Sequence, residues 1–423
     1  MILIVLLMVY LVDFPRALFV LGLFVLSYLF LQTYLFLRIK AYILAHVQSR
    51  RRQRLYLDLS TAFFLLMLIP LAGQAFFGWK FTENYPWAIR FLYNYFAVWV
   101  FGSSGCSLAL LGHVFFSRTI ARGSEGHSAP ISDRRDFIKK GLGLAAAAPF
   151  FISGYGVVQG RHRFQIDHFE IPINDLSSDL SHLTVVQLSD IHLGPFMPAE
   201  ELAGYVDAVN RLKPDLVVLT GDFVDTGPHE AFPCVETLAG LRSQYGVFVC
   251  LGNHDVLAGA DDALTDLFRK SGVGVLRNDA KTLRVGNSSL NILGIDDLLW
   301  GGADLPLALK ACEGEAGEVR MLLSHRPEIF QRAAGQGVDM VLSGHYHGGQ
   351  VKLAPFVKNL SIARLITPYA EGLFHLPARG GAVDGRGKDS TLFVSRGIGI
   401  TGLPIRINCP PQIAHLRLVN QKA

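Results

Sequence analysis

Residues 338–350 read VDMVLSGHYHGGQ, and this stretch decides how the C-terminal part of the chain is expected to fold. The apolar residues 340–342 predict a short buried strand, and the Ser-Gly pair that follows predicts a loop where the strand ends. Two histidines two positions apart, His345 and His347, can both face a site while Tyr346 turns away. These two imidazoles can therefore ligate two neighbouring metal ions, one each.

Length and charge indicate a membrane part joined to a water-soluble part. The chain has 423 residues, of which 50% are hydrophobic and 17% are charged, with room for about two to three domains. Residues 1–140 carry 15 Lys or Arg against 6 Asp or Glu, whereas the remaining residues carry 24 against 29. A basic, very apolar N-terminal third is typical of a membrane domain. Five cysteines without CxxC spacing argue against a disulfide framework, and the sequence contains no nucleic-acid-binding motif.

The N-terminal part predicts three to four transmembrane helices within residues 1–160. The apolar stretches are residues 17–37, about 55–79, about 91–116 and 141–158. A helix needs about 20 apolar residues to cross the bilayer core, so the first three qualify, while the fourth is shorter and rich in glycine. The loops 38–54 and 118–140 are basic, and the positive-inside rule places both in the cytoplasm. Everything after residue 158 is then extracytoplasmic in a multi-pass membrane protein.

A short motif precedes the fourth stretch. Residues 133–140 read DRRDFIKK and are followed by a weakly apolar Ala/Gly segment, which is similar to a twin-arginine export signal. The alternative is that Arg134 and Arg135 only anchor the helix on the positive side. Residues 141–158 could be cleaved or retained, and if they do not cross the bilayer, the C-terminal domain is cytoplasmic.

From residue 161 to residue 423 the sequence predicts a layered α/β domain, with β-sheets flanked by helices. Short apolar runs with many β-branched residues alternate with amphipathic segments, which is the pattern of such a fold. The expected strands are 183–188, 216–220, 247–251, 290–293, 320–323, 340–342, 391–394 and 413–418, and the expected helices are 198–212, 229–242, 261–271 and 327–334. Most runs are continuous, so the strands are expected to be buried on both faces.

Five of the expected strands end in residues that can bind a metal. The segments are SDIH (189–192), GDFVD (221–225), GNHD (252–255), SH (324–325) and GHYH (344–347). Such sites lie at the carboxyl ends of strands in α/β sheets. Each segment alone could be a turn or a solvated loop, but five of them in one domain favour a metal site. Asp, Asn and His ligands without a thiolate suit Mn, Fe, Zn or Co.

Taken together and in this order, the five segments resemble the calcineurin-like metallophosphoesterase superfamily. Its pattern is D-x-H, G-D-x-x-D, G-N-H-D/E, an isolated His and G-H-x-H, and the resemblance covers roughly residues 161–423. Later segments, GGQ (348–350), SRG (395–397), PIR (404–406) and CPP (409–411), are similar to a membrane-associated bacterial branch. That branch includes UDP-2,3-diacylglucosamine hydrolases and twin-arginine-exported, wall-associated phosphoesterases.

The resemblance implies two divalent metal ions (Mn, Fe or Zn) and a set of site residues. It implies one ion held by Asp190, His192 and His347, a second held by Asn253, His325 and His345, and Asp222 as the bridging ligand. It also implies that His254 stabilises or protonates the leaving oxygen and that Asp255 orients His254 or stabilises its charge. Asp225 is left outside the metal set, as a residue that fixes its loop.

The expected function is that of a membrane-anchored phosphoesterase or pyrophosphatase in which a metal-bridging hydroxide attacks phosphorus. The membrane bilayer is the expected partner, and a lipid-linked, nucleotide or cell-envelope phosphate is the expected kind of substrate. The alternative is a catalytically inactive metal-binding or receptor module. The complete ligand set and the presence of His254 argue against that alternative. The natural substrate and the oligomeric state stay open.

Overall fold

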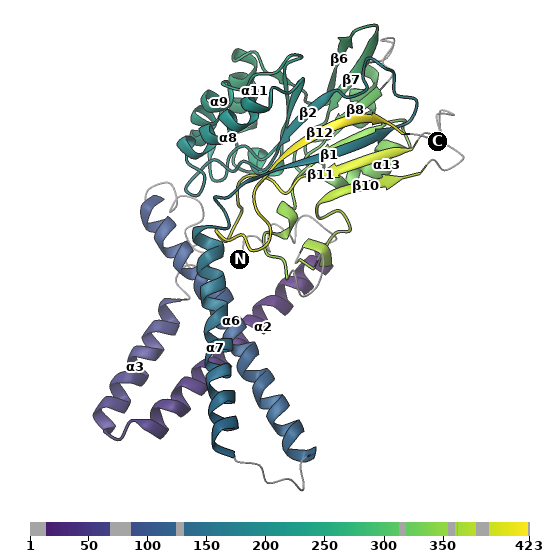
Figure 1. Cartoon of the computed structure of the whole chain (residues 1–423). Helices are drawn as coiled ribbons and strands as arrows, with labels where there is room; N and C mark the ends of the chain where they lie inside the picture. Colours follow the sequence, from purple (N-terminus) through teal and green to yellow (C-terminus); the bar gives the residue numbers. More distant parts are fainter. Residues whose placement is uncertain are drawn as a thin grey trace. The chain divides into compact units, whose positions relative to one another are not determined.

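A computed structural model describes residues 14–67, 86–123, 131–312, 319–353, 360–361, 363–377 and 389–421. The chain divides into two compact units, residues 1–160 with 402–407, and residues 161–401 with 408–423 (Figure 1). The segment 402–407 is distant in sequence from the rest of its unit. Within that unit the backbone N–H of Arg406 donates to the carbonyl oxygen of Gly156 at 3.2 Å.

Four helices make up most of residues 14–158 of the first unit, as far as they are described. Its helices are α2 (Phe14–His46), α3 (Arg50–Leu66), α6 (Pro86–Gly123) and α7 (Ile131–Val158). Among the described residues, two segments are long and apolar enough to cross a membrane, Arg90–Phe116 and Lys140–Val158. They coincide with the third and fourth predicted spans. The first predicted span is helical as part of α2, and the second is helical as far as Leu66; beyond residue 67 it lies outside the described residues.

The basic loops predicted from the sequence are shorter than expected. Helix α2 continues to His46 and α3 begins at Arg50, so only residues 47–49 separate them, in place of the predicted loop 38–54. Helix α7 begins at Ile131, so the twin-arginine-like segment 133–140 is helical rather than a loop. The physical reason is that Arg, Lys and Ala are good helix formers. Basic residues after an apolar run therefore do not end the helix.

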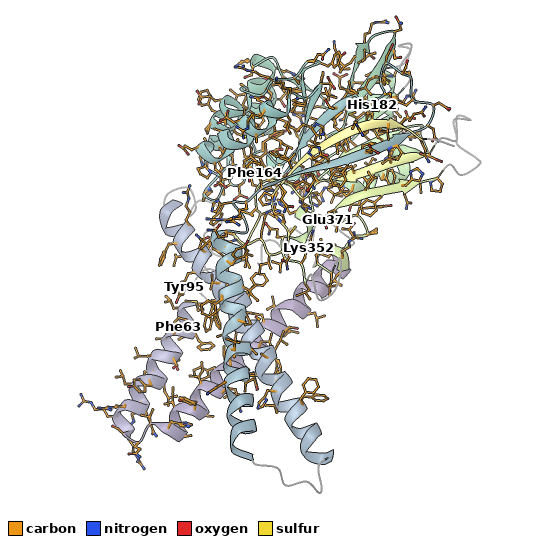
Figure 2. The ribbon with its side chains drawn as sticks, in the orientation of Figure 1. Phe63, Tyr95, Phe164, His182, Lys352 and Glu371 are labelled. Atoms are coloured by element: carbon orange, nitrogen blue, oxygen red, sulfur yellow. The ribbon has the colours of Figure 1, made fainter. Side chains whose placement is uncertain are left out.

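Polar and aromatic contacts join the helices of the first unit. Gln32 of α2 donates from Nε2 to Ser103 Oγ of α6 at 2.8 Å, and both side chains are buried. Phe63 of α3 (Figure 2) meets Trp99 of α6 edge-on, with ring centroids 4.7 Å apart. A buried side-chain hydrogen bond of this kind fixes the pairing of helices whose remaining contacts are apolar.

The second unit contains two six-stranded sheets. The first has the order β1 (Gln165–Ile173), β12 (Gln412–Asn420), β2 (Thr184–Leu188), β3 (Leu216–Thr220), β4 (Val247–Cys250), β5 (Gly274–Val275). The second has the order β10 (Gly372–Leu376), β11 (Ser390–Val394), β9 (Met340–Ser343), β8 (Val319–Leu323), β7 (Ser288–Gly294), β6 (Asp279–Val285). All eight predicted strands are present. The four unpredicted strands, β1, β5, β6 and β10, are the edge strands of the two sheets.

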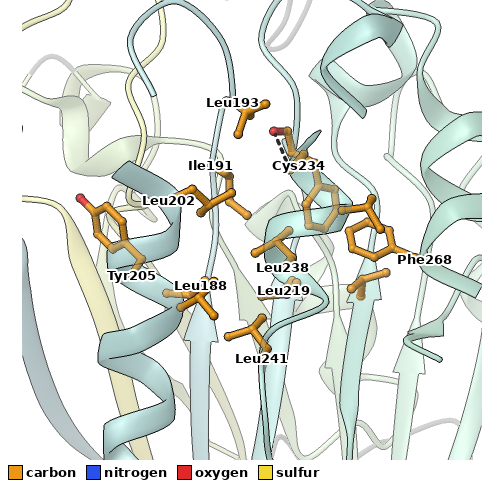
Figure 3. Packing of buried hydrophobic residues seen from close by; sticks show 14 of the residues in the cluster. Leu188, Ile191, Leu193, Leu202, Tyr205, Leu219, Cys234, Leu238, Leu241 and Phe268 are labelled. Atoms are coloured by element: carbon orange, nitrogen blue, oxygen red, sulfur yellow. Dashed lines mark hydrogen bonds between the residues drawn. The ribbon is translucent and has the colours of Figure 1, made fainter. Parts of the chain in front are cut away.

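Sheets and helices form four layers in the order α/β/β/α (Figure 1). The outer face of the first sheet packs on α8 (Ala199–Leu212), α9 (Ala231–Leu238) and α11 (Asp261–Lys270), and that of the second on α12 (Leu305–Ala311) and α13 (Phe330–Ala334). Figure 3 shows the first of these cores, in which Leu202, Leu238 and Phe268 of the helices meet Leu188 and Leu219 of the sheet. The shorter helices are α10 (Asn253–Leu257), η1 (Pro228–Glu230), η2 (Pro327–Ile329), η3 (His347–Gly349) and η4 (Ala363–Leu365).

A further core lies between the two sheets, and it explains the continuous apolar runs. Val218 of β3 and Leu342 of β9 belong to this inner core, whereas their neighbours Leu219 and Val341 belong to the outer cores. Every residue of β3 and of β9 is buried. The prediction that the strands are buried on both faces is therefore confirmed for these central strands.

Candidate metal centre

The predicted ligands all follow central strands. Asp190 and His192 follow β2, Asp222 follows β3, Asn253 follows β4, His325 follows β8, and His345 and His347 follow β9. Strands β2, β3 and β4 are mutually parallel in the first sheet, and β8 and β9 are parallel in the second. Their carboxyl ends therefore share an edge within each sheet, and the structure brings ligands from both sheets together.

The first cluster consists of Asp190, His192 and His347, whose candidate ligand atoms lie within 4.8 Å of one another. The Nε2 atoms of His192 and His347 face each other at 3.2 Å, and Asp190 Oδ1 lies 3.3 Å from His347 Nε2. Two imidazole lone pairs at this distance repel unless a proton or a cation lies between them. The cluster therefore fits a divalent cation.

The second cluster consists of Asp222, His325 and His345. His325 Nε2 lies 3.0 Å from Asp222 Oδ2 and 3.2 Å from His345 Nδ1. The Nδ1 of His325 donates to the carbonyl oxygen of Thr220 at 2.7 Å, which leaves the Nε2 lone pair free for a metal. Asp222 Oδ2 also lies 3.5 Å from His192 Nε2, so this one oxygen is close to both clusters.

Two buried polar groups lack partners in this region. Within the described residues, neither amide atom of Asn253 has a hydrogen-bond partner, and Asp190 Oδ2 has none. Both side chains are fully buried, and a buried polar atom without a partner is unfavourable by about 1–3 kcal/mol. Carboxylate and amide oxygens together with imidazole nitrogens are ligands for Mn, Fe and Zn. The residues present therefore fit a divalent-metal centre.

The backbone at the site is strained. Asp190, His192, Asp222, His345 and His347 have φ values of 53°, 47°, 56°, 76° and 50°. For residues other than glycine this region costs of the order of 1–3 kcal/mol each and persists only where the surroundings impose it. Close approach of the loops is one such constraint, because a Cβ at Gly344 would overlap Ser189 Oγ and Asp190 Oδ2.

The buried carboxylate of Asp222 makes the second cluster favourable for a positive charge. Burial alone would raise the pKa of Asp222, but His325, His254 and His192 outweigh it and hold that pKa well below its usual range. Burial lowers the pKa of His325, yet the charge and hydrogen bond of Asp222 raise it to about 10. A cation bound beside Asp222 would stabilise the same carboxylate.

His254 belongs to neither cluster but lies with His192 and Asp225 in a third. Asp225 Oδ1 lies 3.3 Å from His192 Nδ1, and burial raises the pKa of Asp225 to about 6. Burial also lowers the pKa of His254, while Asp222 opposes that shift. From the sequence, Asp225 was expected only to fix its loop. The feature of the sequence that indicates a position near the candidate ligands is the G-D-x-x-D segment, in which Asp225 stands three residues after Asp222.

The Asp255 carboxylate makes hydrogen bonds with the backbone of two loops. Its carboxylate accepts hydrogen bonds from the backbone N–H groups of Gly252, Asp222, Phe223 and Val224, at 2.8, 3.0, 2.7 and 3.2 Å. Asp255 therefore fixes the loop that carries Asp222, and the acid beside His254 is Asp225.

Arg326 also contacts the site, and this contact could not be predicted from the sequence. Its Nη1 lies 2.9 Å from His345 Nε2.

The second unit has four α/β/β/α layers. Buried Asp, Asn and His residues at its strand ends form a candidate centre for divalent metals. Residues 183–349 match the family model of the calcineurin-like phosphoesterases. The uncharacterized metallophosphoesterase YkuE of Bacillus subtilis is 31% identical over 295 residues, which cover 66% of this chain and 95% of the relative. The chain belongs to the calcineurin-like phosphoesterase family, and this membership implies phosphoesterase activity.

Two other relatives differ in how much of their length is matched. An uncharacterized metallophosphoesterase of Aquifex aeolicus is 34% identical over 239 residues, covering 55% of this chain and 84% of the relative. A Danio rerio protein named transmembrane protein with metallophosphoesterase domain is 31% identical over 287 residues. That match covers 65% of this chain and 62% of the relative, so it spans less than two thirds of the Danio protein.

Proposed function

We propose that this chain is a membrane-associated phosphoesterase that hydrolyses phosphate-ester or pyrophosphate bonds with two divalent metal ions. The observation that carries the proposal is the position of Asp222, whose Oδ2 lies 3.5 Å from His192 and 3.0 Å from His325, in different clusters. A carboxylate shared between two clusters is the arrangement that a two-metal hydrolase requires.

The chain's own side chains supply the ligands. One ion would be held by Asp190, His192 and His347, the other by Asn253, His325 and His345, with Asp222 shared between them. When bound, two such ions supply a hydroxide nucleophile at neutral pH and stabilise the attacking and leaving oxygens of an in-line displacement. The protein's task is to hold the ligands in place, and the Asp255 hydrogen bonds to the Asp222 loop serve that task.

His254 is proposed as the group that protonates the leaving oxygen. Its backbone N–H donates to Asp222 Oδ1 at 2.8 Å, which fixes the residue beside the shared carboxylate. Its ring meets the His192 ring edge-on, with centroids 4.5 Å apart. Asp225 lies within 4.8 Å of the same imidazole and can stabilise its protonated form. A donor placed in this way assists an alkoxide that would otherwise leave as a strong base.

The proposal includes a bacterial inner-membrane location, several membrane spans and an extracytoplasmic phosphoesterase unit. Its membrane association is supported by the two apolar helices α6 and α7, whose side chains Phe115, Leu144 and Phe151 are 68%, 74% and 76% exposed. The name of the Danio relative and the basic residues flanking the spans agree with it. A phosphoesterase tethered in this way suits a substrate in or near the bilayer, such as a phospholipid, a lipid-linked nucleotide or a wall polymer.

A substrate panel tests the proposed function. We expect the purified full chain to hydrolyse at least one of three substrates: a phosphate monoester, a phosphodiester and a nucleotide-diphosphate lipid. Chelation should abolish that activity, and Mn²⁺ should restore it, because hydroxide formation depends on the ions. A chain that binds Mn²⁺ but turns over none of the three substrates would instead be the non-catalytic metal-binding module.

Reporter fusions test the orientation. A reporter placed after Ala423 should be extracytoplasmic and one placed within residues 50–54 cytoplasmic, because loop charges set the topology. Both reporters on one side would refute this scheme. If the twin-arginine-like segment directs export, changing Arg134 and Arg135 to lysine should keep the phosphoesterase unit inside. If these arginines only anchor the helix, lysine should serve equally well.

A further inference from the structure

Each imidazole of the site has an inner ring nitrogen, which points toward the other candidate ligands, and an outer one, which points away from them. The imidazoles differ in the group that the outer nitrogen contacts. In His325 that nitrogen is Nδ1, which donates to the Thr220 carbonyl at 2.7 Å. In His192 it is also Nδ1, which faces Asp225 Oδ1 at 3.3 Å. Both neighbours are acceptors. An acceptor draws the ring proton to the outer nitrogen and leaves the inner Nε2 with a lone pair for a metal.

His345 has the opposite arrangement. Its Nδ1 points inward, 3.2 Å from His325 Nε2, and its outer Nε2 faces Nη1 of Arg326 at 2.9 Å. A guanidinium carries only donors, so this contact is a hydrogen bond only if His345 Nε2 is the acceptor. The ring proton must then lie on Nδ1, the nitrogen that would ligate the metal. Arg326 therefore favours the tautomer of His345 that cannot bind an ion.

Asp297 fixes Arg326 in this position. Asp297 Oδ2 accepts from Arg326 Nε at 2.6 Å, and both side chains are at most 2% exposed. Asp297 Oδ1 accepts from the backbone N–H groups of Leu299 and Trp300, each at 3.0 Å. The guanidinium is thus held from the loop that follows β7. It cannot leave the His345 ring without breaking a buried, charge-assisted contact.

We propose that the Arg326–Asp297 pair acts on His345 as a positioning device that weakens one of the two metal positions. The position formed by Asp222, Asn253, His325 and His345 would bind its ion less tightly than that formed by Asp190, His192 and His347. Binding at the weaker position requires the His345 proton to leave Nδ1 and the Arg326 Nη1 contact to break, whereas the outer Nδ1 of His192 faces the carboxylate of Asp225 at 3.3 Å. The inference rests on the proposed two-metal function.

Metal titration of the full chain tests this inference. The detergent-solubilised protein is stripped with a chelator and titrated with Mn²⁺ by calorimetry, and the spin signal of free Mn²⁺ gives an independent count. Two unequal binding steps are expected in the wild type. Arg326→Met removes the opposing donor at similar volume, and the Asp297 carboxylate keeps its backbone hydrogen bonds. We expect the Mn²⁺ affinity of the weaker binding step to rise by about 10–100-fold, the usual size of effects from partners of metal-ligating histidines. The affinity of the stronger step should stay unchanged.

Asp297→Asn is the companion variant with the same expected sign. Its amide oxygen can keep the hydrogen bonds from the Leu299 and Trp300 N–H groups, which turns its NH2 group toward the donor Nε of Arg326. The guanidinium then loses its anchor, so the weaker step should tighten. Arg320→Met is the matched control, because Arg320 lies on β8 and its Nη1 contacts the Gln336 carbonyl; both steps should stay unchanged in this variant. If Arg326→Met does not fold, the sign of the Asp297→Asn shift decides.

Several outcomes would overturn the inference. Two binding steps of equal affinity in the wild type would do so. A lower-affinity step that stays unchanged or weakens in Arg326→Met, or that weakens in Asp297→Asn, would also do so. None of these outcomes would contradict the proposed function. That function is refuted separately if the wild type binds no Mn²⁺ or hydrolyses none of the three substrates.

Discussion

Changing His254 to alanine is expected to slow the hydrolysis of an alkyl phosphate ester by about 10²–10⁴-fold, the usual contribution of a positioned general acid. Metal content should stay near that of the wild type, because His254 belongs to neither of the two clusters that gather around Asp222. Steady-state rates and metal analysis of the same preparation check both halves of this expectation.

The leaving group separates proton donation from other tasks of His254. Nitrophenolate leaves without a proton, so the loss with a nitrophenyl ester should be much smaller than with the alkyl ester. His229→Ala is the matched control, since His229 is exposed and lies outside the site, and it should leave both rates unchanged. Equal slowing of both substrates, or loss of metal, would show that His254 is a ligand or a structural residue.

Changing Asp222 to asparagine should have the larger effect. It removes the charge that one carboxylate oxygen presents to His192 at 3.5 Å and to His325 at 3.0 Å. We expect fewer than one ion per chain and a rate at least about 10³-fold lower, because bound ions contribute several kcal/mol of transition-state stabilisation. Metal analysis after dialysis, together with rates at saturating Mn²⁺, measures both effects.

The control for Asp222 is an acid on the same strand segment but at its other end. Asp215 precedes β3 and accepts from the Thr184 backbone N–H at 2.8 Å, away from the ligands that follow the strand. Asp215→Asn should keep full metal content and activity. A variant Asp222→Asn that keeps both ions would rule out the shared position assigned to this carboxylate.

The central strands could be predicted from sequence, but the edge strands could not. A central strand such as β3 is buried on both faces and reads as a continuous apolar run. In strand β1 only Ile171 and Ile173 are buried, and the apolar Ile166 is exposed together with polar residues; β5 is only two residues long. Such segments lack the apolar run or the strict alternation on which recognition depends. Helix ends in the first unit were misplaced because basic residues continue a helix rather than end it.

At the site, the ligands could be predicted, but several of their supports could not. Each predicted ligand closely follows an apolar run in the sequence. Its position at a strand end can therefore be predicted from the neighbouring residues alone. The contacts of Asp255 with the Asp222 loop and of Arg326 with His345 join different loops of the fold. Those pairings are fixed by how strands lie side by side. The chemistry of the individual residues does not reveal them.

Diffraction from Mn²⁺-loaded crystals of the full chain, recorded at the manganese absorption edge, tests the central claim most directly. The account predicts two anomalous peaks about 3.5–4 Å apart, with Asp222 in contact with both, Asp190, His192 and His347 around one, and Asn253, His325 and His345 around the other. A single peak at full Mn²⁺ occupancy, or peaks away from these residues, would contradict it.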